Sequence, residues 1–134
     1  MTGGAPEGQV LPPHVFADVT NDLPVSQEEM FGPIAPIIKV AGDAEALRVA
    51  NNTQYGLSSC VFVFTRDRER GVRFALGVEA GMTHMNDHSV DDTAIGPFGG
   101  EKQRSRPLRR RLDHLRVTRD HWITVRHAPA AFPF

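Results

Sequence analysis

The stretch Glu28-Glu29-Met30-Phe31-Gly32-Pro33 organises the rest of this 134-residue chain. Gly32 precedes a proline, which favours an extended backbone, and Pro33 has no N–H to donate to a strand ladder. The sequence therefore predicts a bent loop that leads into a strand. A carboxylate there can accept hydrogen bonds from paired hydroxyls, and an aromatic face can pack against a flat ring. This suits a ribose joined to a heterocycle, although a surface acidic pair beside a core phenylalanine is the commoner origin of such a pattern.

Length and composition limit the class of protein. A chain of 134 residues forms one domain with a modest core, and its formal net charge of −1 does not favour a nucleic-acid partner. The single cysteine, Cys60, excludes an internal disulfide and fits a reducing compartment. Residues 1–13 lack the pattern of a signal peptide, and no apolar run approaches the roughly 20 residues of a membrane helix. We therefore expect a soluble, cytoplasmic protein without a membrane partner.

The apolar pattern predicts alternating strands and helices. Strands are expected at 14–19, 34–40, 57–65, 82–86 and 121–126. The strands at 34–40 and 57–65 have the apolar composition of buried strands, with Cys60 inside the second of them. Their alternation with helices favours an α/β fold with a mixed or parallel sheet.

Two helices are expected between these strands. The first follows Gly42, with Asp43 as its N-cap, and ends at Asn51-Asn52. The second covers 67–79, where apolar residues recur at helical spacing: Val72, Ala75, Leu76 and Val78. Each helix is therefore predicted to have an apolar face.

Two segments have no helical or strand periodicity. Residues 87–100 form a long loop that ends in Pro97-Phe98-Gly99-Gly100, where glycines permit close backbone approach and Phe98 offers an apolar surface. A glycine turn with one packed aromatic is the commoner interpretation of that ending. Residues 103–119 contain seven of the fifteen basic residues. A solvated segment is favoured over a nucleic-acid arm, because no aromatics interleave with the arginines.

Five stretches, in order along the chain, resemble the C-terminal part of an aldehyde dehydrogenase, nearest to the benzaldehyde- and vanillin-type branch. They are Glu28 to Pro33 (EEMFGP), Asn51 to Ser58 (NNTQYGLS), Glu79 to Met82 with Asn86-Asp87 (EAGM and ND), Pro97 to Lys102 (PFGGEK), and Asp120 to Val125 (DHWITV). One such motif is weak, whereas five in order are specific.

The arginine-rich block departs from the family pattern, which returns by Asp120. Out-of-frame translation of that block is therefore a further hypothesis.

The resemblance implies a fold and an organisation. Residues 1–102 would be the late part of the α/β catalytic domain, 103–119 an atypical segment, and 120–134 an oligomerisation strand with its tail. The residues from Trp122 to Arg126 would form the strand that joins subunits. The implied reaction is oxidation of an aldehyde to a carboxylic acid with NAD or NADP.

The resemblance also implies roles for individual residues. Glu29 would bind the nicotinamide ribose hydroxyls, and Phe31 would lie against the nicotinamide. Phe98 would line the aldehyde pocket. The variable substrate loop would contain His88, Ser89 and Val90. No residue is assigned to catalysis or to a metal.

The family's nucleophilic cysteine, its activating glutamate and its dinucleotide-binding half lie upstream of the EEMFGP segment. Cys60 falls in the strand after YGLS, so we do not expect it to be that nucleophile. The expectation is a fragment that is inactive alone and has the missing half as its partner. The alternative is a non-catalytic module that pairs through its Trp122 strand with a full-length relative.

Overall fold

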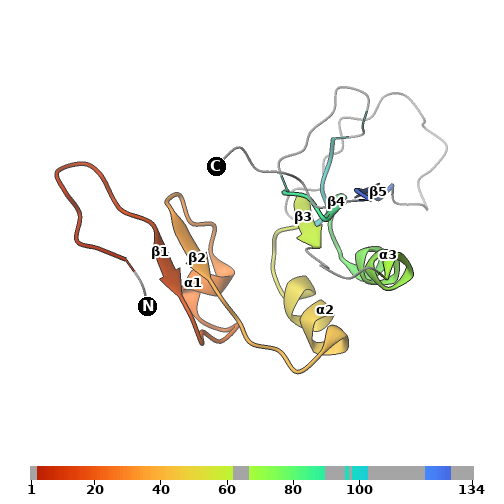
Figure 1. Cartoon of the computed structure of the whole chain (residues 1–134), viewed down its shortest axis with the longest axis horizontal. Coiled ribbons are helices and arrows are strands. Elements are labelled where there is room, and N and C mark those ends of the chain that lie inside the picture. Colours follow the sequence, from red (N-terminus) through yellow and green to blue (C-terminus); the bar gives the residue numbers. More distant parts are fainter. Residues whose placement is uncertain (1–2, 62–66, 90–95, 97, 103–119, 128–134) are drawn as a thin grey trace. The chain divides into compact units, whose positions relative to one another are not determined.

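The computed structural model describes residues 3–61, 67–89, 96, 98–102 and 120–127. The chain forms two compact units, Met1–Asn52 and Thr53–Phe134 (Figure 1). Each unit contains its own sheet, and every pair of neighbouring strands in the two sheets is parallel. The prediction of an α/β fold with parallel strands is confirmed.

The first unit is built on two short parallel strands, β1 (His14–Phe16) and β2 (Ile34–Pro36). The connection between them includes α1 (Pro24–Gln27), a single helical turn that the sequence did not predict. Proline is well suited to the first position of α1, because that N–H has no partner within a helix. The predicted bent loop follows α1 and leads directly into β2.

The prediction that residues 34–40 form a buried strand is wrong. Ala35 and Pro36 are exposed, and Ile37, just after the strand, is 49% exposed. A two-stranded sheet offers little cover, and Pro36 has no N–H with which to continue the ladder. The apolar composition of this stretch therefore marks a short strand rather than a core strand.

Helix α2 (Asp43–Asn51) has the predicted length but a different N-cap. Gly42 occupies the cap position, so Asp43 is the first helical residue, and no side chain caps the helix. The Glu45 carboxylate instead accepts a hydrogen bond from the Ala41 N–H at 2.7 Å. The helix dipole also stabilises a negative charge in the first turn. The predicted end at the asparagine pair is confirmed.

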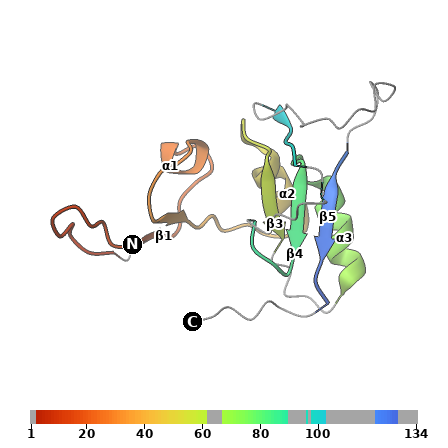
Figure 2. The same cartoon turned by 90° about the horizontal axis from the view of Figure 1, so that it is seen from above.

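The second unit contains a three-stranded parallel sheet in the order β3 (Ser58–Val61), β4 (Met82–Met85) and β5 (Trp122–Val125). Figure 2 shows the three strands side by side. All four residues of β4 are buried, because this strand pairs on both sides. The strand predicted at 82–86 is therefore the centre of the unit.

The prediction that residues 57–65 lie buried between two layers is wrong for the part that the structure describes. Strand β3 lies at one edge of the described sheet, and Cys60 on it is exposed. Residues 62–65 lie outside the described part of the chain. An edge strand has one neighbour instead of two, so apolar composition alone did not determine its burial.

Helix α3 (Arg68–Gly77) follows the predicted bounds closely. Its N-cap is Asp67, whose side chain accepts a hydrogen bond from the Arg70 N–H at 3.1 Å. Such a cap satisfies one of the first N–H groups of a helix, which have no partner within it. The start of α3 is thus determined locally by its sequence.

One face of α3 packs against the sheet. Gly71 and Ala75 are buried on that face, and Val78 is buried just after the helix. Leu76, predicted on the same face, is 64% exposed, so that part of the prediction is wrong. The buried face is narrow because the helix approaches β4 through a glycine and an alanine.

Candidate functional site

The predicted cofactor loop connects α1 to β2 in the first unit. Phe31 on this loop is 96% exposed, and Glu29 is exposed beside it. The commoner interpretation, a core phenylalanine, is therefore excluded. Glu29 and Phe31 lie on one short segment without regular structure. A carboxylate and an exposed aromatic ring are therefore accessible on the same loop.

Three of the recognised motifs meet in the second unit at a cluster that we call the glycine junction, formed by Gly56, Gly81, Gly99 and Gly100. The Gly56 carbonyl accepts hydrogen bonds from the Gly81 N–H at 3.0 Å and from the Glu101 N–H at 2.8 Å. A Cβ on Gly56 would lie 2.8 Å from the carbonyl oxygen of Glu79. The glycines therefore allow three segments of backbone to approach closely.

The glycine junction fixes the position of the candidate pocket residue Phe98. This residue precedes Gly99, and its side chain is 44% exposed. On the other side of the junction, Lys102 Nζ lies 3.1 Å from Glu79 Oε2. The segment that carries Phe98 is thus held by the backbone hydrogen bond from Glu101 to Gly56 and by an ion pair.

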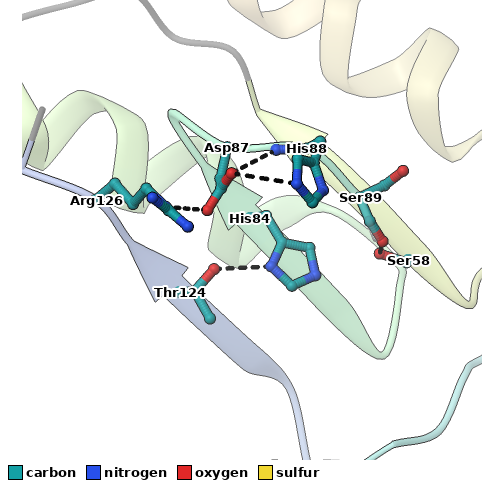
Figure 3. A network of polar contacts seen from close by, with 7 residues as sticks. All are labelled: Ser58, His84, Asp87, His88, Ser89, Thr124 and Arg126. Atoms are coloured by element: carbon teal, nitrogen blue, oxygen red, sulfur yellow. Dashed lines mark hydrogen bonds and ion pairs between the residues drawn. The ribbon is translucent and has the colours of Figure 1, made fainter. Parts of the chain in front are cut away.

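The candidate substrate-loop residues His88 and Ser89 follow β4 after a two-residue turn, Asn86-Asp87. Figure 3 shows His88 beside Asp87 and Ser89 beside Ser58 of β3. The Ser89 carbonyl accepts a hydrogen bond from Ser58 Oγ of β3 at 2.8 Å. The His88 side chain is 47% exposed. Val90, the third predicted residue of this loop, lies outside the described residues.

Hydrogen bonds between side chains connect β4 to its neighbours. His84, which is 1% exposed, is joined through Nδ1 to Thr124 Oγ1 of β5 at 2.8 Å (Figure 3). Thr83 is joined through Oγ1 to Ser59 Oγ of β3 and to His121 Nε2, both at 2.8 Å. Buried polar groups are thus satisfied across all three strands.

Burial lowers the pKa of His121, because desolvation disfavours the charged imidazolium, and the nearby Glu101 carboxylate opposes this shift. A lowered pKa favours the neutral ring, which is the form that can accept a hydrogen bond from a threonine hydroxyl. Through its hydrogen bond to Thr83, His121 therefore supports the docking of β5 onto β4.

Cys60 is exposed, in contrast to the predicted buried position. Desolvation by surrounding atoms nevertheless raises the pKa of the Cys60 thiol, while hydrogen bonding with Ser89 partly opposes the shift. A thiol with a raised pKa carries little thiolate near neutral pH and is a poor nucleophile. That Cys60 is not the catalytic nucleophile stays a prediction.

Sequence reasoning missed the most buried charge of this region. Asp87 has a side chain that is 0% exposed, and it forms an ion pair with Arg126 at the end of β5 (Figure 3). The sequence contains a weak signal, a carboxylate directly after a buried strand. Its partner could not be identified, because Arg126 is 39 residues away.

The absence of a metal site and of a membrane-spanning helix can be stated only for the described residues. No group of three or more potential metal ligands occurs among the described residues. No helix in the described part is long and apolar enough to cross a membrane. The arginine-rich segment, 103–119, lies outside the described residues.

A model of the aldehyde dehydrogenase family matches residues 1–109. A vanillin dehydrogenase from Pseudomonas sp. (strain HR199 / DSM 7063) is 35% identical over 136 aligned residues, which cover 99% of this chain and 27% of the relative. The chain therefore belongs to the aldehyde dehydrogenase family. The predicted likeness to the vanillin-type branch is confirmed. The chain spans between 19% and 28% of the length of the curated relatives it matches.

Solved structures agree with this assignment. The crystal structure of a salicylaldehyde dehydrogenase from Pseudomonas putida G7, complexed with salicylaldehyde, is 40% identical and has a TM-score of 0.72. The match covers 78% of this chain and 21% of that chain. A Mycobacterium tuberculosis aldehyde dehydrogenase complexed with NAD+ is 35% identical, with a TM-score of 0.66, covering 75% and 21% of the two chains. The fold of the described units is thus that of part of an aldehyde dehydrogenase.

Proposed function

We propose that this chain forms the late part of the catalytic domain of an NAD(P)-dependent aldehyde dehydrogenase that oxidises an aromatic aldehyde to a carboxylic acid. The observation that carries the proposal is the similarity to the salicylaldehyde dehydrogenase described above, whose structure contains an aromatic aldehyde. The similarity to a vanillin dehydrogenase supports the same class of substrate.

The loop at residues 28–33 fits a pyridine nucleotide. The Phe31 ring is 96% exposed, so its face is available to a nicotinamide, and the exposed Glu29 carboxylate can accept hydrogen bonds from ribose hydroxyls. When bound, NAD or NADP would accept the hydride from the substrate. In this proposal Glu29 and Phe31 hold and orient the nicotinamide end of the cofactor.

The aldehyde pocket in this proposal is lined by Phe98 and by the substrate loop with His88, Ser89 and Val90. The partly exposed Phe98 ring would contact the aromatic ring of the aldehyde, and the glycine junction keeps its backbone in place. The partly exposed His88 would supply a polar contact. Apolar walls with a few positioned polar groups are typical of small-molecule sites.

The first prediction tests Glu29 in an enzyme that supplies the upstream machinery. A chimera of the Pseudomonas putida G7 salicylaldehyde dehydrogenase, carrying residues 1–102 of this chain in place of its matching segment, is expected to oxidise salicylaldehyde with NAD+. In that chimera, Glu29→Gln is expected to raise the KM for NAD+ about 10- to 100-fold, because hydrogen bonds to a charged group contribute about 1.5–3 kcal/mol.

The adjacent exposed carboxylate offers a matched control. Glu28→Gln in the same chimera removes one negative charge from the same loop, and it should leave the KM for NAD+ within about twofold. The KM for salicylaldehyde should change little in both variants. Equal effects of the two substitutions on the KM for NAD+ would contradict the role assigned to Glu29.

A second candidate function, that of an interaction module, is favoured by the position of β5. This strand pairs with β4 on one side and lies at the edge of the described sheet. An edge strand presents backbone N–H and C=O groups that can pair with another chain. In this alternative the chain acts without catalysis by adding to the sheet of a full-length relative.

Size-exclusion chromatography separates the two candidates. As an interaction module, this chain should co-elute with a full-length aromatic aldehyde dehydrogenase. Substitution of Ile123 in the middle of β5 by proline should abolish co-elution, because proline removes a strand donor and disfavours strand pairing. A chain that elutes separately from the homologue at every ratio would rule out the module.

A further inference from the structure

The turn that follows β4 is built around a buried carboxylate. The Asp87 side chain is 0% exposed and forms an ion pair with the Nε of Arg126. Its Oδ1 also accepts a hydrogen bond from the His88 backbone N–H at 3.0 Å (Figure 3). A buried carboxylate is strongly unfavourable unless it is paired with a cation and hydrogen-bonded. The conformation of this turn therefore depends on Arg126.

Arg126 also contacts the turn through its backbone. The Asn86 side-chain amide donates a hydrogen bond to the Arg126 carbonyl at 3.2 Å, and the Arg126 N–H donates to the Met85 carbonyl at 3.2 Å. Asn86 has φ 59°, in the left-handed region, which asparagine adopts more readily than most residues other than glycine. The end of β5 thus contacts the turn through backbone and side-chain hydrogen bonds.

Beyond the turn, the loop is anchored a second time. The Ser89 carbonyl accepts a hydrogen bond from Ser58 Oγ at 2.8 Å on β3. His88 lies between the two anchors, with its Nε2 4.0 Å from Asp87 Oδ1 and its side chain 47% exposed. The backbone of His88 is therefore held on both sides, while its imidazole stays accessible.

We propose that Asp87 and Arg126 are positioning residues for the substrate loop, and that their ion pair fixes His88 and Ser89 for contact with the aldehyde. The assignment of His88 and Ser89 to the pocket rests on the proposed function. The consequence is that β5 determines the shape of the aldehyde site as well as completing the sheet. Neither residue contacts the reacting atoms in this proposal.

Amide hydrogen exchange on the full chain tests the positioning step without any enzyme activity. In Arg126→Met, exchange of the His88 amide is expected to accelerate about tenfold or more, because its carboxylate acceptor loses its cation. Arg126→Lys should restore part of the protection. The Met82 amide, which donates to the Leu57 carbonyl at 3.1 Å, reports whether the sheet remains folded.

The matched control removes a different arginine. Arg73→Met breaks an exposed ion pair with Glu69 on α3, at 3.5 Å, and should leave His88 exchange unchanged. Acceleration at His88 that equals the acceleration at Met82 would show general loosening of the unit and would overturn the proposal. So would an unchanged rate at His88 in Arg126→Met.

The chimeric enzyme described above tests the substrate step. For this test the chimera carries this chain's residues through Arg126. Arg126→Met is then expected to raise the KM for salicylaldehyde about tenfold and to leave the KM for NAD+ unchanged. Arg126→Lys should restore part of the affinity for salicylaldehyde. An unchanged KM for salicylaldehyde would overturn the proposal. An inactive chimera would instead count against the proposed function, and the exchange rates would still decide whether Arg126 positions the loop.

Discussion

Replacing Gly81 by alanine is expected to lower the free energy of unfolding of the second unit by about 3 kcal/mol or more. The new Cβ would lie 2.7 Å from the carbonyl carbon of Gly99 and 2.9 Å from the Cα of Gly100. Both atoms belong to the backbone, so no side chain can rotate away to relieve the clash.

Movement of Gly81 itself is also restricted. Its N–H donates to the Gly56 carbonyl at 3.0 Å, and its carbonyl accepts from the Trp122 N–H at 2.9 Å. A shift that relieved the clash would therefore break hydrogen bonds to Gly56, before β3, and to Trp122 on β5. The substitution is therefore expected to disturb all three segments that meet at the glycine junction.

Trp122 provides the probe for this experiment, because it is the only tryptophan in the chain and lies on β5. Its fluorescence in a urea titration should report unfolding of the second unit. Gly32→Ala is the matched control, since its Cβ would meet only Ile34 Cδ1, at 4.0 Å. Transition midpoints that coincide for the two variants would contradict the role assigned to the glycine junction.

Local sequence patterns predicted the features that depend on neighbouring residues. The Gly-Pro break gave the loop before β2, and the bounds of α3 follow from the Asp67 cap and the helical spacing after it. The order of strands and helices was sufficient to predict an α/β fold with a mixed or parallel sheet. The family resemblance identified the three motifs that contain these glycines, but it did not predict that they meet at the glycine junction.

Burial and long-range pairing were not predicted, for physical reasons. Composition suggested that the strand around Cys60 is covered on both faces, but burial depends on the strand order, which leaves β3 at an edge and β4 at the centre. The contact between Asp87 and Arg126 joins residues that are distant in sequence, and no local pattern specifies it. Leu76 was misplaced because the helix face that contacts the sheet is narrower than an apolar stripe suggests.

The packing of α3 against β4 predicts that the effect of a substitution at Gly71 depends on Met85. Met85 is 1% exposed and is the largest fully buried side chain in the described core. Met85→Ala is expected to lower the free energy of unfolding by about 2–5 kcal/mol, because it removes buried apolar contacts and leaves a cavity. The cavity would open beneath Gly71, whose Cβ position lies 2.5 Å from Met85 Sδ and 3.1 Å from its Cε.

Gly71→Ala should therefore have a less favourable effect with Met85 present than in Met85→Ala. With Met85 present, the added methyl group overpacks the contact at a cost of about 1–3 kcal/mol, which cancels or exceeds the gain of about 1 kcal/mol in helix propensity. In Met85→Ala the clashing atoms are gone, so the same substitution should stabilise the unit by about 1 kcal/mol. The expected coupling between the two positions is about 1–3 kcal/mol.

A double-mutant cycle followed by Trp122 fluorescence in urea measures this coupling directly. The control cycle combines Gly71→Ala with Leu76→Ala on the same helix, where the leucine is 64% exposed. That cycle should be additive within about 0.5 kcal/mol, because an exposed side chain leaves no cavity when it is truncated. If Gly71→Ala destabilised the Met85→Ala variant as much as the unmodified chain, the glycine would not be required by Met85. The close approach of α3 to β4 would then need another cause.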